Sequence, residues 1–198
     1  MVEAGIALVL ASKKFTLGHM AATTSGLMTV EDFRKLPEQE GLFYELRRGE
    51  IHSVTRPKHR HYSIQRRLRR LLESLAPSDG LVDIEFAFRA VAEYELRVAD
   101  LVYVSGNRER LIHPDDNLHG APDLVIEVLS PSNTSEEISD KEKLCLGNGC
   151  QEFWVVDPKL RQVSVSTVDG RSAIWCSGQE IPLALFGGKA LTVDEIFV

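Results

Sequence analysis

Two carboxylates stand inside runs of residues that otherwise have the composition of buried β-strands. Glu127 lies in the run PDLVIEVLS, and Asp100 lies in the run ELRVADLVYVS. A buried carboxylate costs several kcal/mol unless a cation or hydrogen-bond donors compensate it. Divalent cations such as Mg²⁺ take one or two carboxylates as ligands, and neighbouring strands lie roughly 4.8 Å apart. Two such strands side by side would let Asp100 and Glu127 share one cation.

The strand acids have a second interpretation. A lone acid in a strand is commonly paired with an arginine or a lysine, so the pattern leaves both an ion pair and a metal site open. Asp123 would share a strand face with Glu127, but four residues cover about 13 Å along a strand, which is too far for one ion. We therefore pair Asp100 with Glu127 and treat Asp123 as a strand-start or supporting residue.

A lysine and a third acid could complete such a site. Lys141 lies on the helix predicted after the Glu127 strand, from which its ammonium could reach back over the acid pair. Phosphodiester hydrolysis needs an attacking water and positive charge near the developing oxyanion, and a metal ion with a lysine provides both. The alternative for Lys141 is a solvated helix lysine, and Lys143 is its rival on the other side of the helix. Glu45, in FYELRRGE, is either a third acid of the site or a surface carboxylate.

Positive charge is concentrated in one segment of a chain whose net charge is −6. Between Arg56 and Arg70 the sequence holds seven lysines and arginines, together with His59 and His61. We predict phosphate contacts from this segment. The predicted contact residues are Lys58, Arg60, His61, Arg66, Arg67 and Arg70. The alternative is a solvated helix face paired with acids, and no motif for reading a base sequence is visible.

These residues are carried by a regular series of predicted elements. Residues 61–75 show the clearest helix, with Ile64, Leu68 and Leu72 on one face and arginines opposite. The other predicted elements are a short helix at 29–36, strands on either side of Gly49 within 43–54, strands at 81–91, 95–105, 122–130 and 151–158, a helix within 132–149, and a hairpin at 162–175. This order predicts a mixed sheet flanked by helices.

The composition fits one globular domain. The chain has 198 residues, of which 43% are hydrophobic and 26% charged. No apolar run approaches the roughly 20 residues that a membrane-spanning helix needs. Three cysteines without CxxC spacing favour a reducing cytoplasm over a disulfide framework or a zinc site. We expect residues 1–27 to be a non-core N-terminal extension and residues 28–198 to form the single domain.

The motifs in combination resemble a known family. The segments YELRRGE, RVADLVYV, PDLVIEVLSPSNT and GCQEFWVVDP, with His61 opening a helix and Lys141 on a later one, are similar to a large bacterial family of restriction-type endonucleases. That family belongs to the PD-(D/E)XK nuclease superfamily. The resemblance runs from about Met28 to the C-terminus.

The resemblance implies a fold, a chemistry and a set of site residues. The implied fold is α/β (α+β), a restriction endonuclease-like mixed central β-sheet flanked by helices. The implied reaction is hydrolysis of DNA with Mg²⁺ or Mn²⁺ held by Asp100 and Glu127. The superfamily commonly places its lysine two residues after the second acid, where this chain has Leu129, and the family resembled places it on the following helix, at Lys141. Glu45 would support the site.

Some positions depart from the family pattern. Ala99 stands where a proline is usual, Arg48 where an acid is usual, and Cys145 where an aromatic residue is usual. None of these removes a proposed catalytic group, but together they allow a diverged member.

Two function hypotheses from different classes therefore stand. The leading one is a Mg²⁺-dependent endodeoxyribonuclease, and the second is a catalytically inactive nuclease-fold module that binds nucleic acid or a protein. RNA or a small phosphodiester is a further alternative substrate. Cutting both strands of DNA would need a homodimer or repeated nicking, so we expect a homodimer. The sequence does not indicate a target sequence.

Overall fold

The computed structural model describes residues 26–37, 43–54 and 58–197. Residues 1–25 of the predicted extension lie outside the described part, so the separation between extension and domain stays a prediction. Met28 is attached to the β1–β2 turn, because its amide donates a 3.0 Å hydrogen bond to the Gly49 carbonyl.

The helices and strands alternate along the chain much as the sequence predicts. In chain order they are α1 (Val30–Phe33), β1 (Phe43–Arg47), β2 (Glu50–Val54), α2 (His59–Leu75), β3 (Leu81–Arg89), β4 (Arg97–Val104), α3 (Gly106–Glu109), β5 (Leu118–His119), β6 (Leu124–Val128), α4 (Ser135–Leu146), β7 (Glu152–Asp157), β8 (Gln162–Thr167), β9 (Ser172–Cys176), β10 (Glu180–Leu183), the 3₁₀ helix η2 (Ala184–Phe186), β11 (Lys189–Thr192) and α5 (Val193–Ile196).

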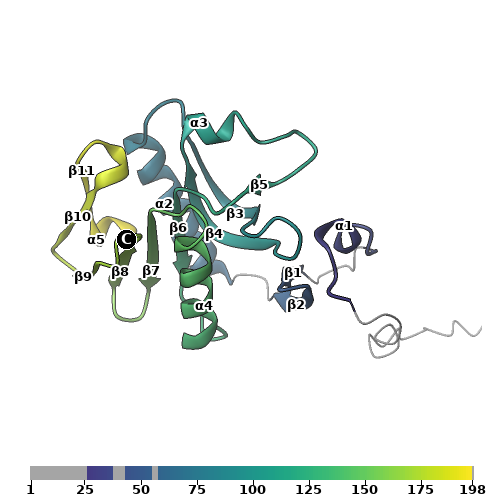
Figure 1. The fold of residues 1–198 in the computed structure, drawn as a ribbon. Helices are drawn as coiled ribbons and strands as arrows, with labels where there is room; N and C mark the ends of the chain where they lie inside the picture. The colour runs from purple at the N-terminus through teal and green to yellow at the C-terminus, as the bar shows by residue number, and fades with distance from the viewer. Residues whose placement is uncertain (1–25, 38–42, 55–57, 198) are drawn as a thin grey trace, which may run out of the picture.

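Seven strands form the central sheet, in the order β5-β3-β4-β6-β7-β8-β9 (Figure 1). The strands β3, β4 and β6 are antiparallel neighbours, whereas β6 and β7 are parallel and are connected through α4. The strands β7, β8 and β9 continue as an antiparallel meander. The predicted mixed sheet flanked by helices is confirmed.

One face of the sheet is covered by α2. The buried residues Ile64, Leu68 and Leu72 of this helix recur at helical spacing and pack in one core cluster with Leu101 of β4 and Ile126 of β6. The apolar face predicted for 61–75 is confirmed, and the helix begins slightly earlier, at His59.

The opposite face is covered by α4, which lies in front of the sheet in Figure 1. Val125 of β6 packs there in a second core cluster with Cys145 of α4. Successive residues of a strand point to opposite faces, so Glu127 lies on the same face as Val125. A capping box between Thr134 and Glu137 fixes the first turn of α4 and so sets the position of the residues that follow on this helix.

The hairpin of β1 and β2 turns through Arg48 and Gly49. Both residues have positive φ, 50° and 76°, as a two-residue type I′ turn requires. Arg48 stands where the family resembled commonly has an acid. Its left-handed backbone is held by a 3.0 Å hydrogen bond from its amide to Glu95 Oε1.

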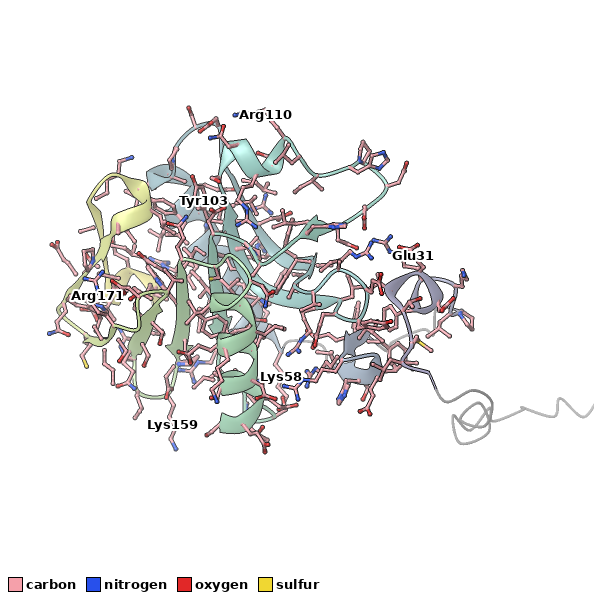
Figure 2. The ribbon with its side chains drawn as sticks, in the orientation of Figure 1. Glu31, Lys58, Tyr103, Arg110, Lys159 and Arg171 are labelled. Carbon is pink, nitrogen blue, oxygen red and sulfur yellow. The ribbon has the colours of Figure 1, made fainter. Side chains whose placement is uncertain are left out.

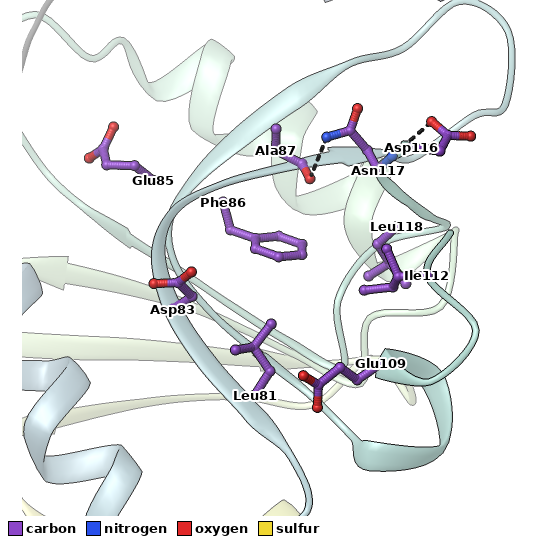
Figure 3. A pocket seen from close by; sticks show the side chains of 10 residues that line it. All are labelled: Leu81, Asp83, Glu85, Phe86, Ala87, Glu109, Ile112, Asp116, Asn117 and Leu118. Carbon is purple, nitrogen blue, oxygen red and sulfur yellow. Dashed lines mark hydrogen bonds between the residues drawn. The ribbon is translucent and has the colours of Figure 1, made fainter. Parts of the chain in front are cut away.

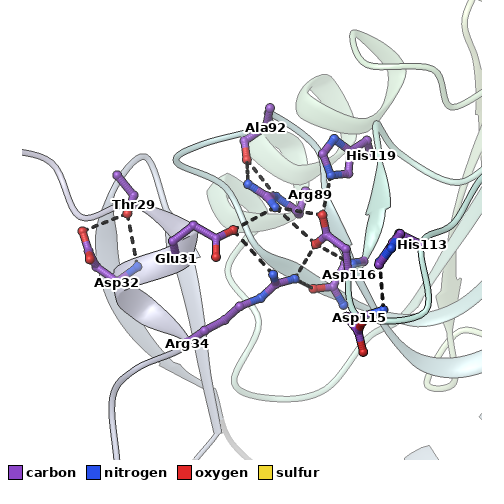
Figure 4. Close-up of polar contacts among 11 residues, drawn as sticks. Thr29, Glu31, Asp32, Arg34, Arg89, Ala92, His113, Asp115, Asp116 and His119 are labelled. Carbon is purple, nitrogen blue, oxygen red and sulfur yellow. Dashed lines mark hydrogen bonds and ion pairs between the residues drawn. The ribbon is translucent and has the colours of Figure 1, made fainter.

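The short helix α1 is tied to the sheet by a polar network around Asp116 (Figure 4). Arg34, at the end of α1, and Arg89, at the end of β3, both donate to the Asp116 carboxylate. Although burial acts in the other direction, hydrogen bonds from His119 and Arg34 lower the pKa of Asp116 far below its usual value. Glu31 of α1 also lies 3.2 Å from Arg89 Nη1, so α1 is attached by two carboxylates and two guanidinium groups.

Several short elements were not predicted. These are β5, β10, β11, α3, α5 and η2, each two to four residues long. A helical or strand period needs more residues than that to be visible in a sequence. Within the described ranges, no helix is both long enough and apolar enough to cross a membrane.

Candidate active site

The strands β4 and β6 separate at Asp100 and Glu127. Their antiparallel ladder runs as far as the pair Leu101 and Ile126 and ends there. Beyond it, side chains take over as acceptors: the Val128 amide donates to Asp100 Oδ2 at 2.7 Å, and the Asp100 amide donates to Glu127 Oε1 at 3.4 Å. The structure therefore brings together the two acids that the sequence paired.

Asp100 is held by donors from two elements. From α2, Gln65 Nε2 donates to Asp100 Oδ1 at 3.0 Å, and His61 Nε2 lies 2.9 Å from Asp100 Oδ2. Burial acts to lower the pKa of His61, but the adjacent Asp100 carboxylate outweighs it and raises that pKa. The hydrogen bonds from Gln65 and from the Val128 amide of β6 fix the orientation of the Asp100 carboxylate, and His61 lies beside it as an ion-pair partner.

Glu127 forms a buried ion pair with Lys141. Lys141 Nζ lies 2.7 Å from Glu127 Oε1 and donates to the Val98 carbonyl at 2.6 Å. Burial raises the pKa of Glu127 to about 7, because the Lys141 charge only partly offsets burial and the negative charge of Asp100 adds to it. Burial acts to lower the pKa of Lys141, but Glu127 and Glu45 outweigh it and raise that pKa.

Lys141 rather than Lys143 reaches the acids. The Lys141 residue is 7% exposed, whereas Lys143 is exposed on the same helix. The alternative of a solvated Lys141 is therefore wrong. The sequence also left open that Glu127 is ion-paired, and the structure contains this ion pair, with Lys141 as the partner.

Glu45 is buried behind the lysine and not on the surface. Its residue is 2% exposed, and Glu45 Oε1 accepts a 2.9 Å hydrogen bond from the Val98 amide and lies 3.9 Å from Lys141 Nζ. Arg47 and Arg97 lie 2.8 and 3.3 Å from Glu45 Oε2. Burial acts to raise the pKa of Glu45, but the charges of Lys141 and Arg97 lower it overall, so Glu45 is an ionised neighbour of Lys141.

Two members of this cluster were not predicted, Gln65 and Glu85. Gln65 is fully buried on the apolar face of α2, and its Nε2 lies 2.5 Å from Glu85 Oε1 as well as close to Asp100. Glu85 of β3 lies opposite Asp100 of β4. Both strands are described throughout, and their ladder pairs the residues on either side of these two but not Glu85 with Asp100. The Glu85 φ of 52° is in the left-handed region, which a non-glycine residue in a strand seldom adopts. The available signal was similar to that for Glu127, an acid among apolar strand residues, but this strand also contains Asp83, so Glu85 is not a lone acid.

The cluster carries excess negative charge. Glu85, Asp100 and Glu127 face one ammonium group, Lys141, and one imidazole, His61, while Glu45 has arginines of its own. Burial is the largest effect on the pKa of Glu85 and raises it, and the Asp100 charge adds to this. Such a site favours an added cation.

The donor chemistry suits a hard divalent cation with open coordination positions. Among residues 26–37, 43–54 and 58–197, no three His, Cys, Asp or Glu side chains converge closely enough to hold a metal ion alone. Two carboxylates with several waters are, however, what Mg²⁺ commonly takes from a protein. Asp100 and Glu127 are the residues that could provide them.

The predicted phosphate-contacting residues fall into three groups. Lys58, Arg60, Arg66 and Arg70 are exposed at the start and on the outer side of α2, whereas Arg67 is half-buried and donates to the Glu195 carbonyl. No ion pair joins Lys58, Arg66 or Arg70 to a carboxylate within the described ranges. His61 belongs to the carboxylate cluster and not to the outer side of the helix.

The start of α2 also adjoins another basic residue. Arg60 Nη2 donates to the Pro158 carbonyl at 2.9 Å, which places the β7–β8 turn with exposed Lys159 beside this end of the helix. Figure 2 shows Lys58 and Lys159 toward the same end of the molecule.

A cavity of about 430 Å³ lies beside the part of β3 that precedes its pairing with β5, between this strand and the segment that leads to β5 (Figure 3). Leu81, Phe86 and Ile112 contribute apolar surface, and Glu85 lies at the margin. In Figure 3 the side chains of Glu85 and Phe86 point to opposite sides of the strand. The cavity therefore adjoins the carboxylate cluster without containing its other members.

Comparisons with known proteins show the family and the fold. The family model Uma2, described as "Putative restriction endonuclease", matches residues 30–190. A crystal structure described as a putative nuclease belonging to DUF820, from Anabaena variabilis, is similar to this chain with a TM-score of 0.73 and 22% identity. The match covers 86% of this chain and 97% of that chain, and at this identity it shows the fold. No curated protein matches the sequence.

Proposed function

The chain belongs to the Uma2 family of restriction-type endonucleases, and we propose that it is a metal-dependent endonuclease that hydrolyses phosphodiester bonds of DNA. The observation that carries the proposal is the opening between β4 and β6. There the Asp100 amide donates to Glu127 Oε1 and the Val128 amide donates to Asp100 Oδ2, and Lys141 Nζ lies 2.7 Å from Glu127 Oε1.

Each group of the cluster has a role in this proposal. Asp100 and Glu127 would hold Mg²⁺ or Mn²⁺. When bound, such an ion polarises the phosphate and makes an attacking water more acidic. Lys141 offsets negative charge that develops on the phosphate in the transition state. Glu45 holds the Lys141 ammonium protonated and in place, because its ionised carboxylate lies 3.9 Å from Nζ.

The expected partner is DNA, held through its phosphates by the exposed basic residues of α2. Cuts in both strands would come from a homodimer or from successive nicks by one site. We propose the cytoplasm as the compartment, since the three free cysteines suit a reducing environment.

Plasmid cleavage tests the proposal. The full chain incubated with supercoiled plasmid and Mg²⁺ or Mn²⁺ should give nicked and then linear DNA on an agarose gel, and excess EDTA should abolish the products. RNA and a small phosphodiester run in parallel would identify the preferred backbone. Retained DNA binding without cleavage under any metal would instead support the second function, a catalytically inactive binding module.

The exposed basic residues of α2 lead to a separate prediction about how DNA affinity depends on salt concentration. Each phosphate contact contributes about 0.9 to the slope of log affinity against log salt concentration, so Arg66→Ala with Arg70→Ala should lower that slope by about 1.8. Fluorescence anisotropy of labelled duplex DNA in Ca²⁺, across a salt series, measures it. Arg69→Ala is the matched control, because Arg69 on the same helix is already paired with Glu73 and Asp83. Equal slopes for the double variant and wild type would remove this face of α2 from the DNA interface.

A further inference from the structure

Gln65 occupies a position where an apolar residue would pack. It is 0% exposed and lies between Ile64 and Leu68, both in the core cluster beneath α2. A buried amide is unfavourable unless it is hydrogen-bonded. Its nitrogen has partners, Glu85 Oε1 and Asp100 Oδ1, whereas its oxygen has no hydrogen-bond partner among the described residues. Packing in the core therefore does not account for a glutamine at this position, whereas its hydrogen bonds to the two carboxylates do.

The two carboxylates need such a donor because of how the strands place them. Glu85 and Asp100 lie between paired residues of β3 and β4, and their carboxylates converge on one nitrogen: Gln65 Nε2 lies 2.5 Å from Glu85 Oε1 and 3.0 Å from Asp100 Oδ1. Like charges directly opposite each other repel. One amide nitrogen that donates to both carboxylates holds them in a defined arrangement and prevents Asp100 from rotating away.

A neutral donor also has an advantage over a charged one. A lysine or arginine at this position would neutralise Asp100 and compete with a bound cation. An amide orients the carboxylate and leaves its negative charge in place. Gln65 also precedes Arg66, an exposed basic residue, so the same helix connects the proposed phosphate contacts to the acid cluster.

We propose that Gln65 is a positioning residue of the active site, which holds Asp100 toward Glu127 by a hydrogen bond and uses Glu85 as its second anchor. This inference rests on the proposed function, because it assigns Asp100 a cation to hold. Gln65 acts through Asp100 and does not touch the reacting atoms. Partners that orient metal ligands in this way typically change metal affinity or activity by 10–100-fold when removed.

The test compares Gln65→Met with wild type in the full chain. Methionine keeps the unbranched shape and removes the donor. Isothermal titration with Mn²⁺ should show affinity weakened by about tenfold, and plasmid cleavage should show a matching loss in kcat with DNA affinity within about twofold of wild type. The control is Ile64→Val, which alters the same buried face of α2 without removing a donor.

The anchor role of Glu85 is tested by a second pair of variants, which leaves the core intact. Glu85→Ala removes the acceptor and should weaken Mn²⁺ binding several-fold, whereas Glu85→Gln keeps an acceptor oxygen and should restore most of it. Equal losses in both variants would mean that the Glu85 charge is what counts, which overturns the anchor role. Unchanged Mn²⁺ affinity in Gln65→Met, with an active wild type, overturns the positioning role alone. A wild type that neither binds Mn²⁺ nor cleaves overturns the proposed function, and this inference with it.

Discussion

Lys141→Met is expected to reduce plasmid cleavage by about a hundred- to a thousandfold, the usual cost of removing one preorganised charge-stabilising group. The ammonium lies 2.7 Å from Glu127 Oε1 and is the cation of the cluster closest to the proposed metal ligands. Without it, less positive charge meets the phosphate in the transition state. DNA affinity measured in Ca²⁺ should stay near the wild-type value, because Lys141 is buried and makes no contribution to the exposed basic face.

The same substitution should also destabilise the fold. It leaves Glu127 and Glu45 without their shared partner, and removal of one member of a buried ion pair commonly costs about 3–5 kcal/mol. Urea denaturation at neutral pH measures this loss, and circular dichroism shows whether the variant is folded under assay conditions. Lys143→Met is the matched control, since it removes an exposed lysine two positions away on α4. A folded Lys141→Met protein with wild-type cleavage would exclude the lysine from catalysis.

The parts of the fold that were predictable are those with a long-range period or a strong local signal. The stripe that contains Leu68 and Leu72 fixed the orientation of α2, and the lone Glu127 in an apolar run marked the strand β6. Pairing Asp100 with Glu127 required only that their strands be neighbours. The position of Lys141 depended on the resemblance, because a lysine on a polar helix gives no sign that it is buried.

Other features depend on contacts that no local pattern contains. Burial of Glu45 follows from the packing of the β1–β2 hairpin against β4, where Arg97 and the Val98 amide compensate it. Gln65 lies in an apolar stripe and gave no signal of its own, and its partners come from two strands. The attachment of α1 through Asp116 joins residues far apart in the sequence, so it could not be seen before the fold was known.

The strained backbone at Glu85 is another feature that no local sequence pattern contains. A left-handed residue in a strand is unfavourable by itself. The left-handed residue occurs where both ladders of β4, with β3 and with β6, are interrupted at Asp100. Backbone pairing is therefore lost at the place where the carboxylates come together. The strand itself was predictable, but its irregularity at Glu85 was not, and local departures of this kind are typical of functional sites in general.

Glu127→Gln is expected to abolish detectable cleavage and to lower Mn²⁺ affinity by more than about a hundredfold, the upper end of the loss seen when only a supporting residue is removed. Glutamine keeps the shape and can still accept the Asp100 amide, but it lacks the charge that a divalent cation requires. Wild-type Mn²⁺ binding in this variant would exclude Glu127 as a metal ligand.

A pH series without metal gives an independent measure of the same residue. Burial raises the pKa of Glu127 to about 7, from an ordinary value of 4.5 in the unfolded chain. A carboxyl whose folded pKa is raised contributes stability that is fully present below the unfolded value and is lost as pH rises through the folded value. In EDTA, the free energy of unfolding of wild type should therefore fall between about pH 4.5 and about pH 7 relative to that of Glu127→Gln. Parallel stability curves for the two proteins across this range would mean that the buried Glu127 carboxyl does not have a raised pKa.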